Sequence, residues 1–142
     1  MGEPAQGVVD WAAFAAMRAE LGPDFIRILG YFREDGEKAV ARIEEAMHRG
    51  DAAAMVIPAH TMKTEARQFG AEPLGELAEE IEFAARRGVE SRLFPDEILP
   101  YVAQLRPLYE ETMAQFEHET NPLVARRPSA DRAASNQEFG RL

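Results

Sequence analysis

The feature that most constrains the fold is an apolar seam at helical spacing between residues 55 and 69. Apolar side chains recur there in steps of four, three, four and three residues, at Met55, Ala59, Met62, Ala66 and Phe69. This period places all of them on one face of an α-helix, whereas a half-buried strand would alternate at every second residue. The segment therefore predicts an amphipathic helix with one buried face.

The same period marks the rest of the chain up to residue 116, and no convincing alternating strand appears. Helices are expected over residues 10–22, 24–50, 51–70, 73–88 and 98–116. Asp10 and Asp51 are residues of the type that caps a helix N-terminus. Helix ends are expected at the glycines that follow the apolar runs, which are Gly22, Gly50, Gly70 and Gly88.

Two prolines interrupt the last helical segment. Proline lacks an amide hydrogen and its ring clashes with the preceding turn, so inside a helix it breaks or kinks the element. We therefore expect a short turn of helix before Pro100 and a bent helix that contains Pro107 after it.

Four long amphipathic helices joined by short loops are typical of an antiparallel up-down four-helix bundle. We expect this all-α fold over residues 1–120, with the short N-terminal helix after Asp10 capping one end. From Asn121 onward the helical period is lost, and proline, serine and arginine are frequent. Residues 121–142 are therefore predicted to be a disordered tail.

Charge and composition exclude several classes of protein. The net charge of -9 comes from 25 acidic and 16 basic side chains, and an acidic body repels the phosphate backbone of nucleic acids. The chain has no cysteine, and no apolar run is long enough to cross a membrane. The N-terminus lacks the pattern of a secretory signal, so we expect a cytoplasmic protein without a membrane segment.

His60 and Lys63 lie one helical turn apart beside the apolar seam. His60 follows Ala59 and so lies about 100° around the helix from the seam, at the edge of the exposed face. An accessible imidazole is a nucleophile when it is neutral near pH 7. We expect an exposed Lys63 whose ammonium offsets the charge of a phosphoryl group on His60.

The segment from Ala59 to Lys63, together with Phe69-Gly70-Ala71, resembles the histidine phosphotransfer (HPt) domain family of two-component phosphorelays. The resemblance covers residues 10–120 and implies that His60 is the phosphorylated residue and that Lys63 assists it. The chain differs from the family at Thr64, where many members have a glycine that lets the partner approach closely. We therefore expect Thr64 to influence partner choice and transfer rate.

The resemblance implies a freestanding phosphoryl carrier, working as a monomer without cofactor or bound metal. It would accept the group from the aspartyl phosphate of one receiver domain and pass it to another. Response-regulator receiver domains and a hybrid or conventional histidine kinase are the partners expected. The docking surface around His60 would include Val56, Ile57, Thr64 and Arg67. No P-loop or other nucleotide motif is present, so we expect no ATP site and no kinase activity.

Two alternatives remain open from the sequence. A helical-bundle adaptor could bind receivers or kinases without accepting phosphate, and Thr64 and Glu65 favour it because they are larger than the usual small pair. A purely structural bundle is favoured by nothing specific. The glutamates of residues 76–82 are expected to face mostly outward, and the Glu-x-x-His pairs of di-iron bundles are absent.

Overall fold

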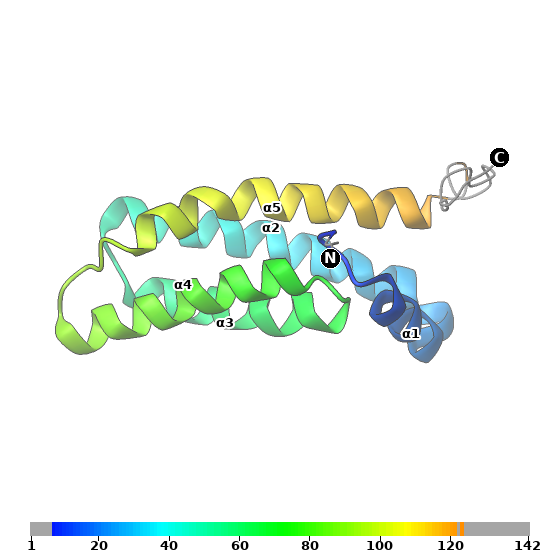
Figure 1. Cartoon of the computed structure of the whole chain (residues 1–142), viewed down its shortest axis with the longest axis horizontal. Coiled ribbons are helices and arrows are strands. Elements are labelled where there is room, and N and C mark those ends of the chain that lie inside the picture. The colour runs from blue at the N-terminus through cyan, green and yellow to red at the C-terminus, as the bar shows by residue number, and fades with distance from the viewer. Residues whose placement is uncertain (1–6, 122, 124–142) are drawn as a thin grey trace. The chain divides into compact units, whose positions relative to one another are not determined.

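The computed structural model describes residues 7–121 and Leu123, and every regular element in that part of the chain is helical (Figure 1). The elements are α1 (Trp11–Leu21), a short 3-10 turn η2 (Gly22–Asp24), α2 (Phe25–Arg49), α3 (Ala53–Gln68), α4 (Glu72–Ser91) and α5 (Ile98–Thr120). The predicted tail lies outside the described residues, apart from Asn121 and Leu123.

The fold is the predicted antiparallel up-down four-helix bundle, in which α2, α3, α4 and α5 are the long helices and α1 is the short N-terminal one. The chain divides into two compact units within α5. The first unit ends at Thr112 and contains every candidate site residue. In the second, α5 ends at Thr120, and the amide of Asn121 donates to the carbonyl of Glu117 at 2.8 Å.

Helices α3 and α4 lie side by side, and their packed faces form much of the core (Figure 1). The predicted seam of α3 is fully buried, with each of its residues no more than 1% exposed. The apolar stripe of α4 is buried as well, at Leu74, Leu77, Ala78, Ile81 and Ala84. This packing fixes which side chains of α4 face the residues that flank the α3 seam.

The N-cap predicted at Asp10 is confirmed, whereas the N-cap residue of α3 is Ala52 and Asp51 contributes its side chain from one position earlier. Oδ1 of Asp10 accepts hydrogen bonds from the amides of Ala12 and Ala13, both at 3.1 Å, at the start of α1. Oδ1 of Asp51 accepts one from the amide of Ala54 at 3.1 Å, in the first turn of α3. Each aspartate satisfies amides that have no partner within the helix.

A backbone hydrogen bond joins the end of α3 to the start of α1. Gly70 has a φ of +82°, and the amide of Asp10 donates to its carbonyl at 2.8 Å. A Cβ at Gly70 would lie 2.6 Å from the carbonyl oxygen of Asp10, so the close approach requires glycine. Phe25, at the start of α2, makes edge-to-face contacts with Phe14 of α1 and with Phe69 at the end of α3. Both α1 and α2 therefore pack near the end of α3.

The expected end of the fourth helix at Gly88 is wrong. Helix α4 continues to Ser91, and Arg92 takes the left-handed conformation with a φ of 61°. Gly88 is needed for packing instead, because a Cβ there would lie 2.7 Å from Cδ of Pro95 and 3.1 Å from Cβ of Ala52.

The expected break at Pro100 is also wrong. Helix α5 begins at Ile98, so Pro100 falls in the first turn, where an amide hydrogen has no helical partner. The helix also continues past Pro107.

Within the first unit, α5 packs on α2 through Tyr109. A Cβ at Gly36 would lie 2.5 Å from the Tyr109 ring, so the bare backbone of α2 makes room for it. The Tyr109 hydroxyl donates to the carbonyl of Arg33 at 2.6 Å, and burial raises its pKa to about 12. Gly36 thus permits close packing of α5 on α2.

Candidate functional site

His60 lies on α3 directly after the buried Ala59, and its side chain is 53% exposed. The helical period of the seam accounts for this position, because one residue beyond a buried position lies at the edge of the exposed face. The imidazole is therefore open to solvent on one side while α3 remains packed against α4 on the other.

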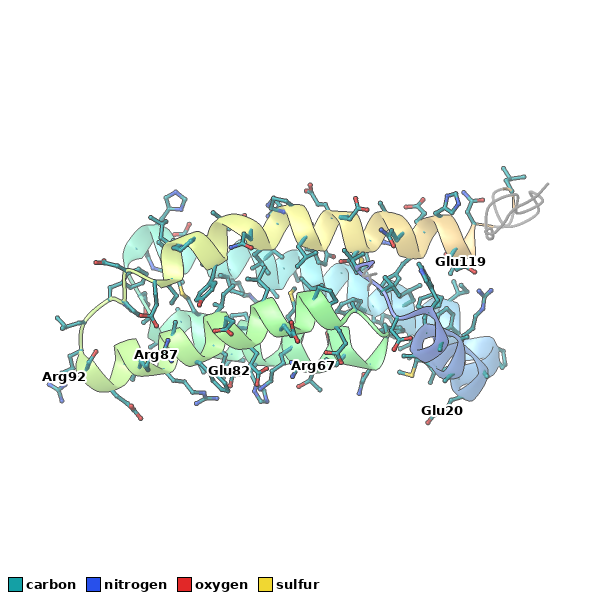
Figure 2. The ribbon with its side chains drawn as sticks, viewed as in Figure 1. Glu20, Arg67, Glu82, Arg87, Arg92 and Glu119 are labelled. Carbon is teal, nitrogen blue, oxygen red and sulfur yellow. The ribbon has the colours of Figure 1, made fainter. Side chains whose placement is uncertain are left out.

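The ring of His60 contacts a buried carboxylate on α4. Nδ1 of His60 lies 3.0 Å from Oε2 of Glu82, whose side chain is only 3% exposed. The expectation that Glu82 faces outward is therefore wrong. Glu82 continues the buried line of Leu74 and Ala78 in steps of four residues, so it occupies a core position of α4. Figure 2 labels Glu82 on this helix.

Two cations share the carboxylate of Glu82 with His60. Nε and Nη2 of Arg86 donate to Oε2 at 3.0 and 2.7 Å, and Nζ of Lys63 lies 2.9 Å from Oε1. The contact between Lys63 and Oε1 is an ion pair. We call Glu82, His60, Lys63 and Arg86 the Glu82 cluster.

The Glu82 cluster keeps its carboxylate ionised. Burial would raise the pKa of Glu82, but the contacts with Lys63, Arg86 and His60 outweigh burial and lower the pKa to about 2. An ionised carboxylate can only accept hydrogen bonds, so the hydrogen shared with His60 belongs to Nδ1. In the neutral ring, Nε2 then carries the lone pair.

Lys63 is less accessible than the sequence indicated. Its side chain is 17% exposed, and its ammonium lies 5.8 Å from the centre of the Phe83 ring in a cation–π arrangement. The expectation of an exposed Lys63 is therefore wrong, because the register of α3 against α4 places Glu82 beside it. Lys63 still lies in the same cluster as His60.

Thr64 is exposed one turn along α3 from His60, and its hydroxyl donates to the His60 carbonyl at 3.2 Å. On the preceding turn Val56 is half-buried and Ile57 is 74% exposed. Val56 and Ile57 line an open groove of 450 Å³ together with Ala53, Arg86, Val89 and Glu90. Apolar surface thus lies directly beside the Glu82 cluster.

Arg67 belongs to a neighbouring set of contacts. Its guanidinium pairs with Glu79 at 2.8 Å and with Glu72 at 3.3 Å, both on α4. A Cβ at Gly75 would lie 2.8 Å from the Arg67 side chain, so Gly75 lets Arg67 cross α4. The structure therefore places Arg67 on the same side of α3 without bringing it into the Glu82 cluster.

The other histidines of the described residues, His48 and His118, are not members of the Glu82 cluster. His48 is in the last turn of α2, and its Nδ1 lies 3.0 Å from the carbonyl oxygen of Glu44. His118 is exposed near the end of α5. Among residues 7–121 and Leu123, no three His, Asp or Glu side chains gather as metal ligands. No helix in this range is both long and apolar enough to cross a bilayer.

Comparison with known proteins agrees with this architecture. The crystal structure of histidine-containing phosphotransfer protein B (HptB) from Pseudomonas aeruginosa PAO1 superposes with a TM-score of 0.72 at 23% identity, covering 81% of this chain and 96% of that chain. At this identity the likeness shows the fold alone. No curated protein matches the sequence closely enough to count as a relative.

The family itself follows from the sequence match. Residues 27–119, which are more than half of the chain, match the family model described as the Hpt domain. Proteins of this family carry phosphoryl groups rather than acting as kinases, and they interact with receiver domains and histidine kinases. The chain belongs to the Hpt domain family and has a histidine phosphotransfer function in phosphorelays.

Proposed function

We propose that His60 is the phosphoryl acceptor of this carrier and that Nε2 is its reactive nitrogen. The observation that carries the proposal is the contact of Nδ1 with the ionised Glu82 on a ring that is 53% exposed. Because Glu82 holds the hydrogen on Nδ1, the lone pair of the neutral ring is on Nε2. A second group that fixes the tautomer of a nucleophilic or ligating imidazole is a common device in protein sites.

The proposed transfer step uses the aspartyl phosphate of a docked receiver domain. The Nε2 lone pair forms a bond to phosphorus as the bond from phosphorus to the aspartyl oxygen breaks, and the aspartate leaves as a carboxylate. The ring keeps its hydrogen on Nδ1 and so gains a positive charge, which faces Oε2 of Glu82. Passing the group to a second receiver reverses these changes. Most of the remaining electrostatic stabilisation, including the metal ion, would come from the receiver.

Lys63 acts in this proposal as the charge partner of the phosphorylated site. Its ammonium balances Glu82 and lies within the same cluster as the imidazole. A cation held beside a developing or transferred phosphoryl charge stabilises it more when it is partly removed from water. The low exposure of Lys63 therefore suits this role, even though the sequence had predicted an exposed lysine.

The docking surface proposed for receivers surrounds His60 on α3. Ile57 and Val56 offer apolar area one turn before the histidine, Thr64 lies one turn after it, and Arg67 follows at the next turn. The partners would be response-regulator receivers and a hybrid or conventional histidine kinase. We propose a monomeric, cytoplasmic carrier that has no ATP site of its own and takes no cofactor.

The test is phosphate transfer from a radiolabelled, phosphorylated receiver to the full chain. Wild-type protein is expected to acquire acid-labile, alkali-stable label, and His60→Gln is expected to fold normally and acquire none. His48→Gln is a matched control, since it removes a histidine at the end of α2. Retained label in His60→Gln contradicts the assignment. Receiver binding without label on the wild type would favour the adaptor function instead.

A further inference from the structure

The Glu82 cluster holds two cations for one carboxylate. Lys63 contacts Oε1, while Arg86 contacts Oε2 through two of its nitrogen atoms. With a neutral His60 the cluster therefore carries one positive charge in excess. A phosphoryl group on His60 would bring negatively charged oxygens beside the Glu82 cluster. Because one cation is enough to balance Glu82, the other can bind these oxygens.

Lys63 is poorly placed to leave Glu82. Its side chain is 17% exposed, and its ammonium contacts Oε1 and lies 5.8 Å from the centre of the Phe83 ring. Oε1 of Glu82 is buried and accepts no hydrogen bond from elsewhere among the described residues. Moving the ammonium away would leave a buried, charged oxygen without a partner, which is unfavourable.

Arg86 is placed differently. Its side chain is 54% exposed, and it contacts Oε2, the oxygen that His60 also contacts. If the guanidinium turns away, Oε2 keeps the hydrogen bond from Nδ1 of His60. Because both groups touch one oxygen, the guanidinium and the imidazole lie no more than two hydrogen-bond lengths apart. A guanidinium also presents a planar fork of donors that suits phosphoryl oxygens.

We propose that Arg86 is the residue that binds the phosphoryl group on His60, by moving its guanidinium from Oε2 of Glu82 to the phosphoryl oxygens. This inference rests on the proposed function of His60. Lys63 stays on Oε1 and keeps the carboxylate ionised during the exchange. The exchange slows the loss of the phosphoryl group to water and is undone when the group leaves for a receiver.

The inference is tested by the lifetime of phosphohistidine on the full chain. Potassium phosphoramidate serves as the phosphoryl donor, so that no partner surface affects the result, and loss of the group is followed after the donor is removed. Arg86→Gln is expected to shorten the half-life several-fold, and Arg86→Lys to restore part of it. Arg87→Gln, at the next residue of α4, is the matched control, because Arg87 pairs with Glu97 instead. It is expected to leave the half-life unchanged.

Two further measurements distinguish direct binding of the phosphoryl group by Arg86 from an indirect effect of Arg86 through Glu82. In a Glu82→Gln background, the additional change Arg86→Gln should still shorten the half-life if Arg86 binds the phosphoryl group, and should do nothing if it acts only through Glu82. In wild-type protein the Nε–H NMR signal of Arg86 should shift on phosphorylation, which requires no variant to fold.

The two proposals fail in different ways. A half-life in Arg86→Gln equal to that of the wild type, with label present on His60, overturns the role of Arg86 and leaves the carrier function intact. An unmoved Arg86 signal in the phosphorylated protein overturns it as well. Label that persists in His60→Gln overturns the assignment of His60, and with it this inference.

Discussion

The carboxylate of Glu82 on α4 holds the imidazole of His60 on α3, with Oε2 and Nδ1 separated by 3.0 Å. The carboxylate is buried and the imidazole is half exposed, so the contact joins the core of the bundle to its surface. Since Glu82 is ionised, it accepts the hydrogen of Nδ1 and directs the lone pair of the neutral ring to Nε2. Under the proposed function, the packing of α3 on α4 thus determines which nitrogen of His60 accepts the phosphoryl group.

The first prediction concerns stability in acid. The folded pKa of Glu82, about 2, lies below the ordinary value of 4.5, so the unfolded chain takes up this proton first as the pH falls. The stabilisation is complete above pH 4.5 and is lost as the pH falls toward 2, by roughly 3 kcal/mol in all. Urea unfolding at a series of pH values should show this loss in the wild type.

The variant Glu82→Gln should lack this part of the acid dependence, because glutamine does not titrate. Glu76→Gln, at an exposed position of the same helix, should keep it. Equal acid dependence in wild type and Glu82→Gln would mean that the contacts of Glu82 do not lower its pKa in solution.

A second prediction concerns Lys63→Met, which keeps an apolar stem and removes the ammonium. The buried Oε1 of Glu82 loses its ion-pair partner, so the free energy of unfolding should fall by roughly 1–3 kcal/mol. Transfer from a phosphorylated receiver should also slow. Lys38→Met, at an exposed position of α2, should change the stability by less than about 0.5 kcal/mol. If both variants behave alike, Lys63 is only a surface charge.

Thr64→Gly is predicted to speed transfer from non-cognate receivers. The Thr64 side chain is exposed one turn from His60, where it can obstruct a docking partner. Stability should fall by somewhat under 1 kcal/mol, because glycine is a poorer helix residue. Transfer rates from several receivers to wild type and variant provide the measurement. Unchanged rates for all of them would show that the threonine does not impede docking.

Two glycines of α2 are predicted to have opposite effects on stability when each is replaced by alanine. Gly36→Ala should destabilise the protein by roughly 1–3 kcal/mol, since its Cβ would lie 2.5 Å from the Tyr109 ring. Gly30→Ala meets nothing within 4 Å and should stabilise it by up to about 1 kcal/mol. Thermal or urea unfolding of both variants is the measurement. A stable Gly36→Ala would contradict the packing described for Tyr109.

The helical fold was predictable because its main signal is local. The period of the α3 seam needs no knowledge of the partner helix, and the caps at Asp10 and Asp51 depend on a few neighbouring residues. Gly88 and Pro100 were misleading for a different reason. The effect of Pro100 depends on where α5 begins, and the role of Gly88 depends on which atoms of other segments approach it. The residue type alone determines neither of these.

The site was predictable only in part. His60 was indicated by its place beside the seam and by the family resemblance, but Glu82 and Arg86 were missed. A glutamate among other glutamates favours the interpretation of a solvated face, although its four-residue steps from Leu74 and Ala78 were a usable signal. Its pairing with His60 and Lys63 depends on the register between α3 and α4, which arises from packing and is absent from either segment alone.

The most direct test of the account is to locate the bond to phosphorus in the phosphorylated protein. Full-length chain labelled with ¹⁵N in its histidine rings is phosphorylated, and the ³¹P–¹⁵N coupling and ring correlations are measured by NMR in solution. The account predicts a single phosphorylated ring, that of His60, with phosphorus on Nε2 and a hydrogen on Nδ1. Phosphorus on Nδ1 of His60, or on any other residue, would contradict it.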